Sequence, residues 1–271
     1  MLMTTASITP RFGELAGELA GDLAAGTSDG RAALVFLSGL TFDRTMWRPA
    51  LRSLRTIDPG RTTLALDMPG EGESTGTFRG LEVAVEQLHV AIAAAGIENP
   101  VLIGHSGSAI GAMFYAMKYP VRGIVNVDAV LDNKAFSARL RALEPQLRNG
   151  GLPAVWDELF AGLHAERSGP AGEAMLRATS RPRPDVMLGY WAPVLAPPPA
   201  AENAIAGAIA NLRAQPTPYT LVLGEEPGTA TRAWMAERFP EATVIALPNS
   251  GHFPHVAHPD AFARILASVS S

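Results

Sequence analysis

A serine at position 106 has the neighbours that a nucleophile needs. The segment over residues 101–109 reads VLIGHSGSA, so an apolar run ends at the serine and small residues follow it. A helical pattern begins at once, and such a strand-to-helix turn presents the hydroxyl at the sheet edge, where only small neighbours fit. The free N–H groups of the new helix would stabilise a negative charge developing there. A serine that merely caps the helix gives a similar pattern, and the last position of Gly-x-Ser-x-Gly is Ser108 here.

A serine hydroxyl is a weak nucleophile at neutral pH and needs a base to accept its proton. Among the six histidines, His252 stands in a loop that reads NSGHFP over residues 249–254, after the last apolar run. Gly251 gives this loop freedom, so the imidazole can reach over the sheet edge. The alternative is a histidine on a surface loop. His105 precedes the serine, and we expect its side chain to point away from it.

The base needs an anion that holds its tautomer and stabilises its cation. Three carboxylates follow apolar runs. Asp128 ends the run at 123–127, and Glu225 and Glu226 follow the run at 219–223. Each also has an ordinary structural interpretation, because a strand-end aspartate often binds loop amides and a loop glutamate is usually solvated.

Short apolar runs alternate with helical patterns along most of the chain, which predicts a mostly parallel sheet covered by helices on both faces. Ligands of such sheets bind at the carboxyl ends of strands, which Ser106 and Asp128 directly follow. We expect strands at 32–37, 62–66, 101–103, 123–127, 219–223 and 242–247, and helices at 47–54, 81–95, 110–119, 229–239 and 259–268.

Residues 133–214 contain no convincing strand, and prolines break much of this segment into short pieces. We interpret it as a helical cap inserted into a core domain made of residues 1–132 and 215–271. Near the N-terminus, residues 12–25 repeat glycine with acidic and apolar residues. We expect two short edge strands there, because three interior glycines disfavour a helix.

The composition excludes several classes of function. The 271 residues carry a net charge of −4 with no long basic run, which argues against nucleic-acid binding. The absence of cysteine excludes disulfides, thiolate zinc sites and cysteine nucleophiles, and the histidines lack the His-Glu-x-x-His spacing of a metal site. With no long apolar stretch and no secretory pattern in residues 1–10, we expect a cytoplasmic protein without a membrane span.

Three motifs together resemble the alpha/beta-hydrolase superfamily. The segment 102–106 resembles its nucleophile elbow, 66–74 (LDMPGEGES) is similar to its turn after the fourth strand, and 250–254, with His-Pro at 258–259, is similar to its histidine loop. The order serine, acid, histidine is also that of the superfamily. The resemblance implies a doubly wound α/β-hydrolase sheet, a cap over the site, and no metal or organic cofactor.

The resemblance also implies an oxyanion hole made by the backbone N–H groups of Leu40 and Gly107. Many members carry His-Gly where this chain has Ser38 and Gly39, a change that leaves backbone donors in place. The usual position of the acid after the seventh strand is occupied here by Pro227. We therefore favour Asp128, since certain haloalkane dehalogenases place their acid after the sixth strand, and keep Glu226 and Glu225 as alternatives.

Serine at position 106, where dehalogenases and epoxide hydrolases carry aspartate, implies acyl transfer. We expect a serine hydrolase that cleaves a small or medium, largely apolar carboxylic ester or lactone through an acyl-enzyme, with a small-molecule substrate as its partner. The alternatives are a hydrolase-like receptor for a small ligand and a cofactor-free lyase, peroxidase-like enzyme or cyclase on the same scaffold. The sequence leaves the oligomeric state open. Apolar cap residues would wall the pocket or form core: Trp156, Phe160, Met175, Met187, Tyr190 and Trp191.

Overall fold

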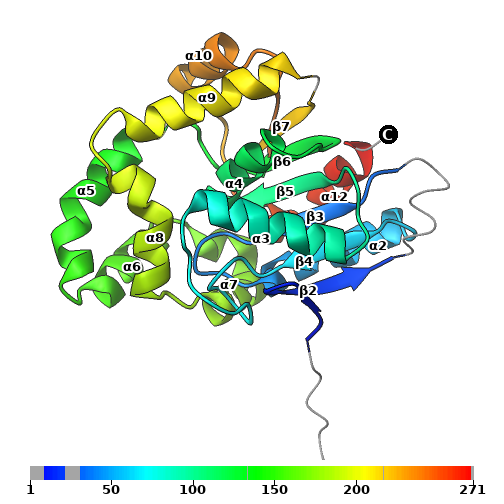
Figure 1. The fold of residues 1–271 in the computed structure, drawn as a ribbon, viewed down its shortest axis with the longest axis horizontal. Helices are drawn as coiled ribbons and strands as arrows, with labels where there is room; N and C mark the ends of the chain where they lie inside the picture. The colour runs from blue at the N-terminus through cyan, green and yellow to red at the C-terminus, as the bar shows by residue number, and fades with distance from the viewer. Residues whose placement is uncertain (1–8, 22–30, 133, 216, 270–271) are drawn as a thin grey trace, which may run out of the picture.

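The protein is built around one eight-stranded sheet, which is mostly parallel as expected (Figure 1). The computed structural model describes residues 9–21, 31–132, 134–215 and 217–269. The strand order is β1-β2-β4-β3-β5-β6-β7-β8, and only the pairings of β2 with β1 and with β4 are antiparallel. The strands are β1 (Arg11–Phe12), β2 (Leu15–Ala20), β3 (Leu34–Leu37), β4 (Thr63–Leu66), β5 (Val101–His105), β6 (Gly123–Val127), β7 (Tyr219–Leu223) and β8 (Thr243–Ala246).

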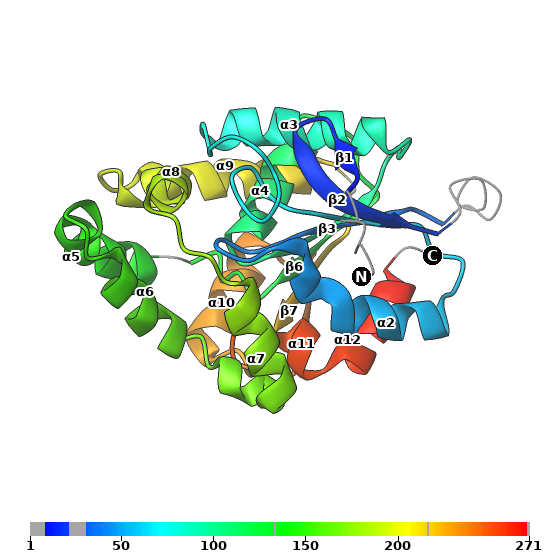
Figure 2. The ribbon, with the colours of Figure 1, turned by 90° about the horizontal axis from the view of Figure 1, so that it is seen from below.

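Successive side chains of the central strands enter two different apolar cores, because a strand points alternate residues to opposite faces. In β3, Leu34 and Phe36 join one core, whereas Val35 and Leu37 join the other. Figure 2 shows α3 above the sheet, with α2 and α12 below it. The first core includes residues of α2 (Arg48–Ile57) and α12 (Pro259–Ser268), and the second includes residues of α3 (Leu81–Ala94), α4 (Gly107–Ala116) and α10 (Thr229–Arg238).

Two short strands form in the described part of residues 12–25, as expected. β1 lies at the edge of the sheet and pairs with β2 antiparallel, whereas β2 lies between β1 and β4 and is not an edge strand. The last part of the predicted segment lies outside the described residues.

The segment expected to form a cap is helical, with longer helices than its prolines indicated. Pro184 opens α8, where a proline is tolerated because its missing N–H has no intrahelical partner, and α9 begins directly after Pro199. The helices are α5 (Lys134–Arg148), α6 (Leu152–Ala161), α7 (Gly169–Thr179), α8 (Pro184–Leu195) and α9 (Ala200–Ala214). Ile205 and Ile209 of α9 pack in the second core of the sheet, and the division into core and cap remains a prediction.

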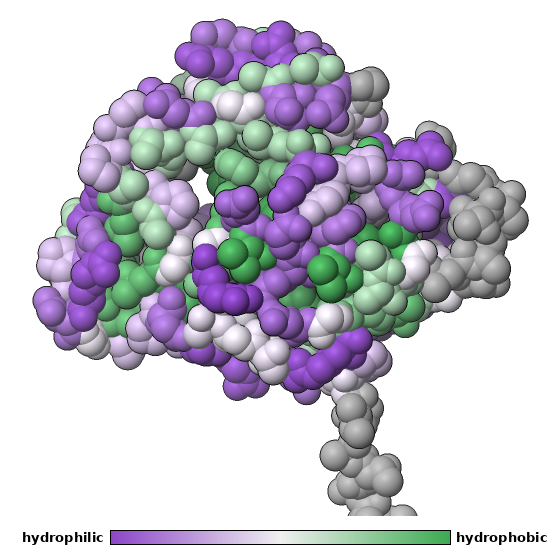
Figure 3. All heavy atoms as spheres, in the orientation of Figure 1, coloured by the Kyte–Doolittle hydropathy of each residue, from purple (hydrophilic) through white to green (hydrophobic). Residues whose placement is uncertain are grey.

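Figure 3 shows the face of the molecule that is turned to the viewer in Figure 1. The surface over α3 is mostly hydrophilic, and apolar residues gather in the recess between α3 and α9. In the described ranges, none of the helices is both long enough and apolar enough to cross a bilayer.

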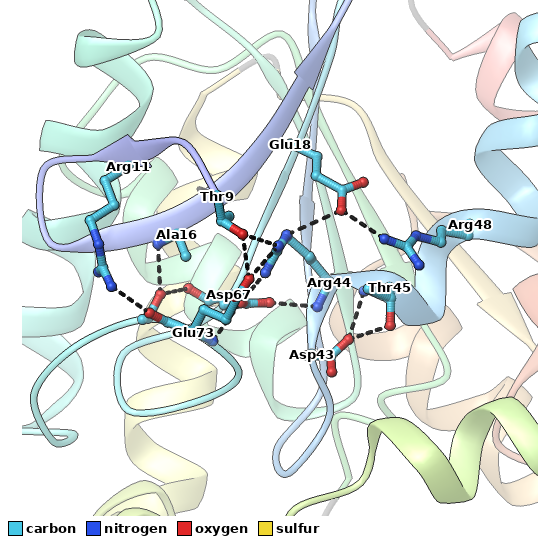
Figure 4. A network of polar contacts seen from close by, with 11 residues as sticks. Thr9, Arg11, Ala16, Glu18, Asp43, Arg44, Thr45, Arg48, Asp67 and Glu73 are labelled. Carbon is cyan, nitrogen blue, oxygen red and sulfur yellow. Dashed lines mark hydrogen bonds and ion pairs between the residues drawn. The ribbon is translucent and has the colours of Figure 1, made fainter. Parts of the chain in front are cut away.

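A buried ion network joins the loop after β3 to the turn after β4 (Figure 4). Asp67 accepts the Arg44 N–H at 2.6 Å and the Glu73 N–H at 2.8 Å, and it also pairs with the Arg44 guanidinium. Gly72 has a φ of 51°, and any Cβ there would collide with the Asp67 carboxylate. The glycine and aspartate of the predicted turn motif thus hold the loop that carries Leu40.

Candidate active site

Ser106 occupies the sharp turn between β5 and α4. Its φ of 54° and ψ of −133° are rare for a serine, and the strain indicates a position that the surrounding structure imposes. The Ser106 N–H donates to the carbonyl of Val127, the last residue of β6, at 2.9 Å. Although Ser106 stands at the helix N-cap position, its hydroxyl makes no capping bond, so the helix-cap interpretation does not account for it.

Two small residues make this turn possible. A Cβ at Gly104 would lie 2.5 Å from the Ala109 backbone. Ser108, which replaces the glycine of the usual pattern, donates its hydroxyl to the buried carbonyl of Ser38 at 2.6 Å. This hydrogen bond ties the start of α4 to the loop after β3, and therefore holds Gly107 and Leu40 on neighbouring loops.

His252 and Asp128 form a close pair. The Nδ1 of His252 lies 2.7 Å from Oδ2 of Asp128, and each side chain is 18% exposed. Asp128 has a φ of 58°, which aspartate tolerates better than most residues, and its Oδ1 accepts the Gly224 N–H at 2.8 Å. The carboxylate is therefore fixed at both oxygens.

The two alternative carboxylates lie elsewhere. Glu225 pairs with Arg167, and Glu226 pairs with Arg232 at 2.7 Å; their side chains are 53% and 65% exposed. The structure brings Asp128, and neither glutamate, into contact with the His252 ring.

Glycines allow the histidine loop to approach the end of β7. A Cβ at Gly224 would lie 1.6 Å from the carbonyl oxygen of Gly251, so only glycine fits there. Gly251 has a φ of 56°, and the next residue, His252, donates its backbone N–H to Leu163 at 2.9 Å. These contacts fix the loop from both sides.

His105 supports this loop and His255 packs beside His105, and sequence reasoning assigned neither of them that place. His105 points toward Gly39, where a Cβ would lie 2.3 Å from its Nδ1, and its Nε2 lies 2.8 Å from the His252 carbonyl oxygen. Burial and then the nearby His252 and His255 charges hold the pKa of His105 well below its usual value. Burial also lowers the pKa of His255 to about 3. Burial therefore favours the neutral form of both rings.

Leu40 and Gly107 provide free backbone donors beside the turn. Gly107 is the first residue of α4, and Leu40 follows the buried Ser38 and Gly39. Across the described part of the chain, neither N–H donates to a protein acceptor. Unpaired N–H groups at a helix N-terminus and in an adjacent loop are suited to bind an oxyanion.

The cap residues expected to wall a pocket are mostly buried. The rings of Trp156 and Phe160 in α6 have their centroids 6.4 and 6.3 Å from that of Phe42. Phe42 stands two residues after Leu40. Met187 and Trp191 of α8 belong to the same core. The two α6 rings therefore pack against Phe42, next to the loop that carries Leu40.

One groove lies away from these residues, between α9 and α10, and is lined by Ile205, Ile209, Trp234 and Arg238 among others. Neither Ser106 nor His252 lines it. Among the described residues, no cluster of three or more histidines and acids is arranged to hold a metal ion.

The sequence model of the alpha/beta hydrolase family matches residues 34–265. The chain therefore belongs to the alpha/beta hydrolase family, and the resemblance read from its motifs is confirmed.

A curated relative is named "Putative carbamate hydrolase RutD", from Escherichia coli O81 (strain ED1a). It is 30% identical to this chain over 130 residues, which cover 46% of this chain and 48% of the relative. The chain thus matches about half the length of this relative.

Solved structures share the fold over nearly the whole chain. An esterase from Thermogutta terrifontis has a TM-score of 0.68 at 20% identity, covering 95% of this chain and 94% of its own. An enol-lactonase from Burkholderia xenovorans LB400 has a TM-score of 0.70 at 17% identity, covering 94% and 95%. An AqdC variant, described in recognition and ring-cleavage of the Pseudomonas quinolone signal, has a TM-score of 0.75 at 17% identity, covering 94% of each chain. At these identities the likeness shows the fold alone.

Proposed function

We propose that this family member is a serine hydrolase that cleaves a small or medium, largely apolar carboxylic ester or lactone through an acyl-enzyme. The observation that carries the proposal is the 2.7 Å contact between His252 and Asp128. The strained Ser106 donates its N–H to Val127, the residue that directly precedes Asp128. His105 and His255 are fully buried, whereas the nearby His252 side chain is 18% exposed. Of these three histidines, His252 is therefore the one that a substrate can reach.

In the proposed mechanism, His252 takes the proton of Ser106 while the serine oxygen bonds to the substrate carbonyl carbon. The N–H groups of Leu40 and Gly107 bind the resulting oxyanion, and His252 then protonates the leaving oxygen as its bond to carbon breaks. In the second half, His252 takes a proton from a water molecule as the water oxygen bonds to the acyl carbon. The bond from that carbon to the Ser106 oxygen then breaks, and His252 returns the proton to the serine. Asp128 stabilises the imidazolium in both halves.

The apolar residues near the Leu40 loop support the proposed substrate class. Trp156 and Phe160 pack against Phe42, and Met187 belongs to the same buried core, so the surroundings of the Leu40 loop are apolar and suit an apolar acyl or alcohol group. Three of the similar proteins are named as an esterase, an enol-lactonase and a carbamate hydrolase, and esters, lactones and carbamates all contain a carbonyl carbon that a serine can attack. Carbamates therefore belong beside esters and lactones in the substrate panel.

A fluorophosphonate probe tests the mechanism. We expect one adduct at Ser106, located by peptide mass spectrometry, and hydrolysis of p-nitrophenyl esters or lactones that Ser106→Ala abolishes. Ser108→Ala is the matched control, because Ser108 lies two residues away with its hydroxyl committed to Ser38, and it should still be labelled. Absence of both labelling and turnover would favour a ligand receptor. Turnover without a Ser106 adduct would favour a lyase, peroxidase-like or cyclase reaction.

A further inference from the structure

The loop that carries Leu40 contains a backbone anomaly. The Phe42 N–H donates to the Gly39 carbonyl at 3.0 Å, which closes a four-residue β-turn with Leu40 and Thr41 at its centre. Thr41 has a φ of 76°, whereas Leu40 has no positive φ. A turn with positive φ at its third position alone is type II, and that position normally requires glycine or asparagine. A β-branched threonine there is a strong outlier.

Every polar group of Thr41 has a partner. Its N–H donates to Oε1 of Glu71 at 2.8 Å, and its carbonyl accepts the Arg181 N–H at 2.7 Å. Its hydroxyl lies 3.2 Å from the Ser180 hydroxyl, which also accepts the Trp156 indole N–H at 3.1 Å. The turn after β4 and the segment between α7 and α8 thus clamp Thr41 from two sides.

The Glu71 bond controls the peptide that distinguishes the two turn types. Types I and II differ mainly by a flip of the central peptide, here the one joining Leu40 to Thr41. The Thr41 N–H belongs to that peptide, so an acceptor fixed at Glu71 selects type II. With threonine at the third position, local preference favours type I once the acceptor is removed.

Glu71 is itself held in place. It is 2% exposed, and a Cβ on the preceding Gly70 would lie 2.8 Å from Val186 of α8. The turn continues to Phe78, whose ring stacks on Tyr190 of α8 at 3.8 Å between centroids. A buried carboxyl that is packed under the cap is a rigid acceptor.

We propose that Glu71 is a positioning residue that locks the Gly39–Phe42 turn in its type II form and so holds the peptide on the C-terminal side of Leu40, the residue whose N–H is proposed to bind the oxyanion. This inference rests on the proposed function, because it assigns the effect of Glu71 to the Leu40 donor. Glu71 acts through Thr41 and touches no reacting atom.

The test compares four variants by kcat and KM on one p-nitrophenyl ester. Glu71→Met removes the acceptor, and we expect kcat to fall about 10²–10³-fold, the effect of losing one oxyanion donor, with KM changed less than threefold. Glu71→Gln keeps an acceptor oxygen and should stay within about fivefold of wild type. Glu82→Met removes an exposed carboxylate that lies outside this turn and should leave kcat unchanged. We expect these differences in kcat because Glu71 accepts the Thr41 N–H.

The decisive variant is Glu71→Met combined with Thr41→Gly. Glycine prefers positive φ at this position, so it should restore the type II turn without the acceptor and return kcat to within about tenfold of wild type. A purely structural role for Glu71 would give no such rescue. Native kcat in Glu71→Met, or a folded double variant as slow as Glu71→Met, overturns the inference. If Glu71→Met does not fold, the activity of the double variant decides.

The outcome is distinguishable from failure of the proposed function. If Ser106→Ala keeps the wild-type turnover, the serine mechanism fails whatever the Glu71 variants do. If turnover depends on Ser106 and Glu71→Met is as active as wild type, only the turn lock fails.

Discussion

The imidazole of His252 and the carboxylate of Asp128 meet at 2.7 Å although 124 residues separate them in the chain. Asp128 directly follows β6, and β6 lies between β5, which ends at His105, and β7, which is followed by Gly224. The adjacent strand ends bring the serine turn, the acid and the glycine that admits the histidine loop to one edge of the sheet.

Asp128→Asn tests this pairing. The amide would favour the wrong tautomer of His252, so kcat should fall by about 10⁴ with little change in KM. Glu226→Gln is the matched control and should stay within about twofold of wild type, because Glu226 pairs with Arg232 at the surface. Near-native turnover in Asp128→Asn would show that another group orients the histidine.

Ser108→Ala tests the bond between the two oxyanion loops. It leaves the Ser38 carbonyl buried without its donor, which should lower the free energy of unfolding by about 1–3 kcal/mol in urea titrations. We also expect a moderate loss of kcat, since the loops of Leu40 and Gly107 lose their tie. Equal stability of the variant and wild type would show that the bond contributes nothing.

Gly39→Ala tests the packing of His105. The added Cβ would lie 2.3 Å from Nδ1 of His105, so the ring must move, at a cost of about 1–3 kcal/mol of stability. Gly207→Ala in α9 meets no atom within 4 Å and should be neutral or stabilising. In thermal melts, the Tm of Gly39→Ala should therefore fall, whereas the Tm of Gly207→Ala should stay the same or rise. A Gly39 variant as stable as wild type would contradict the observed packing.

The pH dependence of stability tests the state of Glu71. Burial raises the pKa of Glu71 from 4.5 to about 8, against the Thr41 hydrogen bond and the Arg183 charge that lower it, while Asp67 and Asp185 raise it slightly. Between these two values the folded protein binds the proton more tightly than the unfolded chain. Protonated Glu71 therefore contributes its full stabilisation below pH 4.5, and this stabilisation is lost as the pH rises toward 8.

Glu71→Gln removes this titration. The stability of the variant relative to wild type should increase between pH 5 and pH 8, by up to roughly 1.4 kcal/mol per pH unit. Tyr190 also faces this carboxyl, but its pKa is raised well above 10, so it does not titrate in that range. Parallel stability curves for the two proteins would show that Glu71 titrates normally.

Most of the strand ends and the serine turn were predictable because they depend on local patterns. The apolar runs that end before Ser106 and Asp128 predicted β5 and β6, and the small residues around Ser106 predicted the sharp turn. The helices between residues 164 and 214 were less predictable. Pro184 and Pro199 indicated interruptions in that segment, yet both stand where a helix begins.

The partners of the site residues depended on the tertiary structure. From sequence, Asp128, Glu225 and Glu226 were all possible partners of His252, and only the strand order and the contact between Gly224 and Gly251 bring Asp128 to the ring. The roles of Ser108 and Glu71 depend on contacts with Ser38 and Thr41, which no local pattern announces. The sequence alone determined which residues could do chemistry, because residue type and local periodicity are encoded in short segments. The tertiary structure decided which of them meet, because hydrogen bonds between distant loops depend on how the whole chain packs.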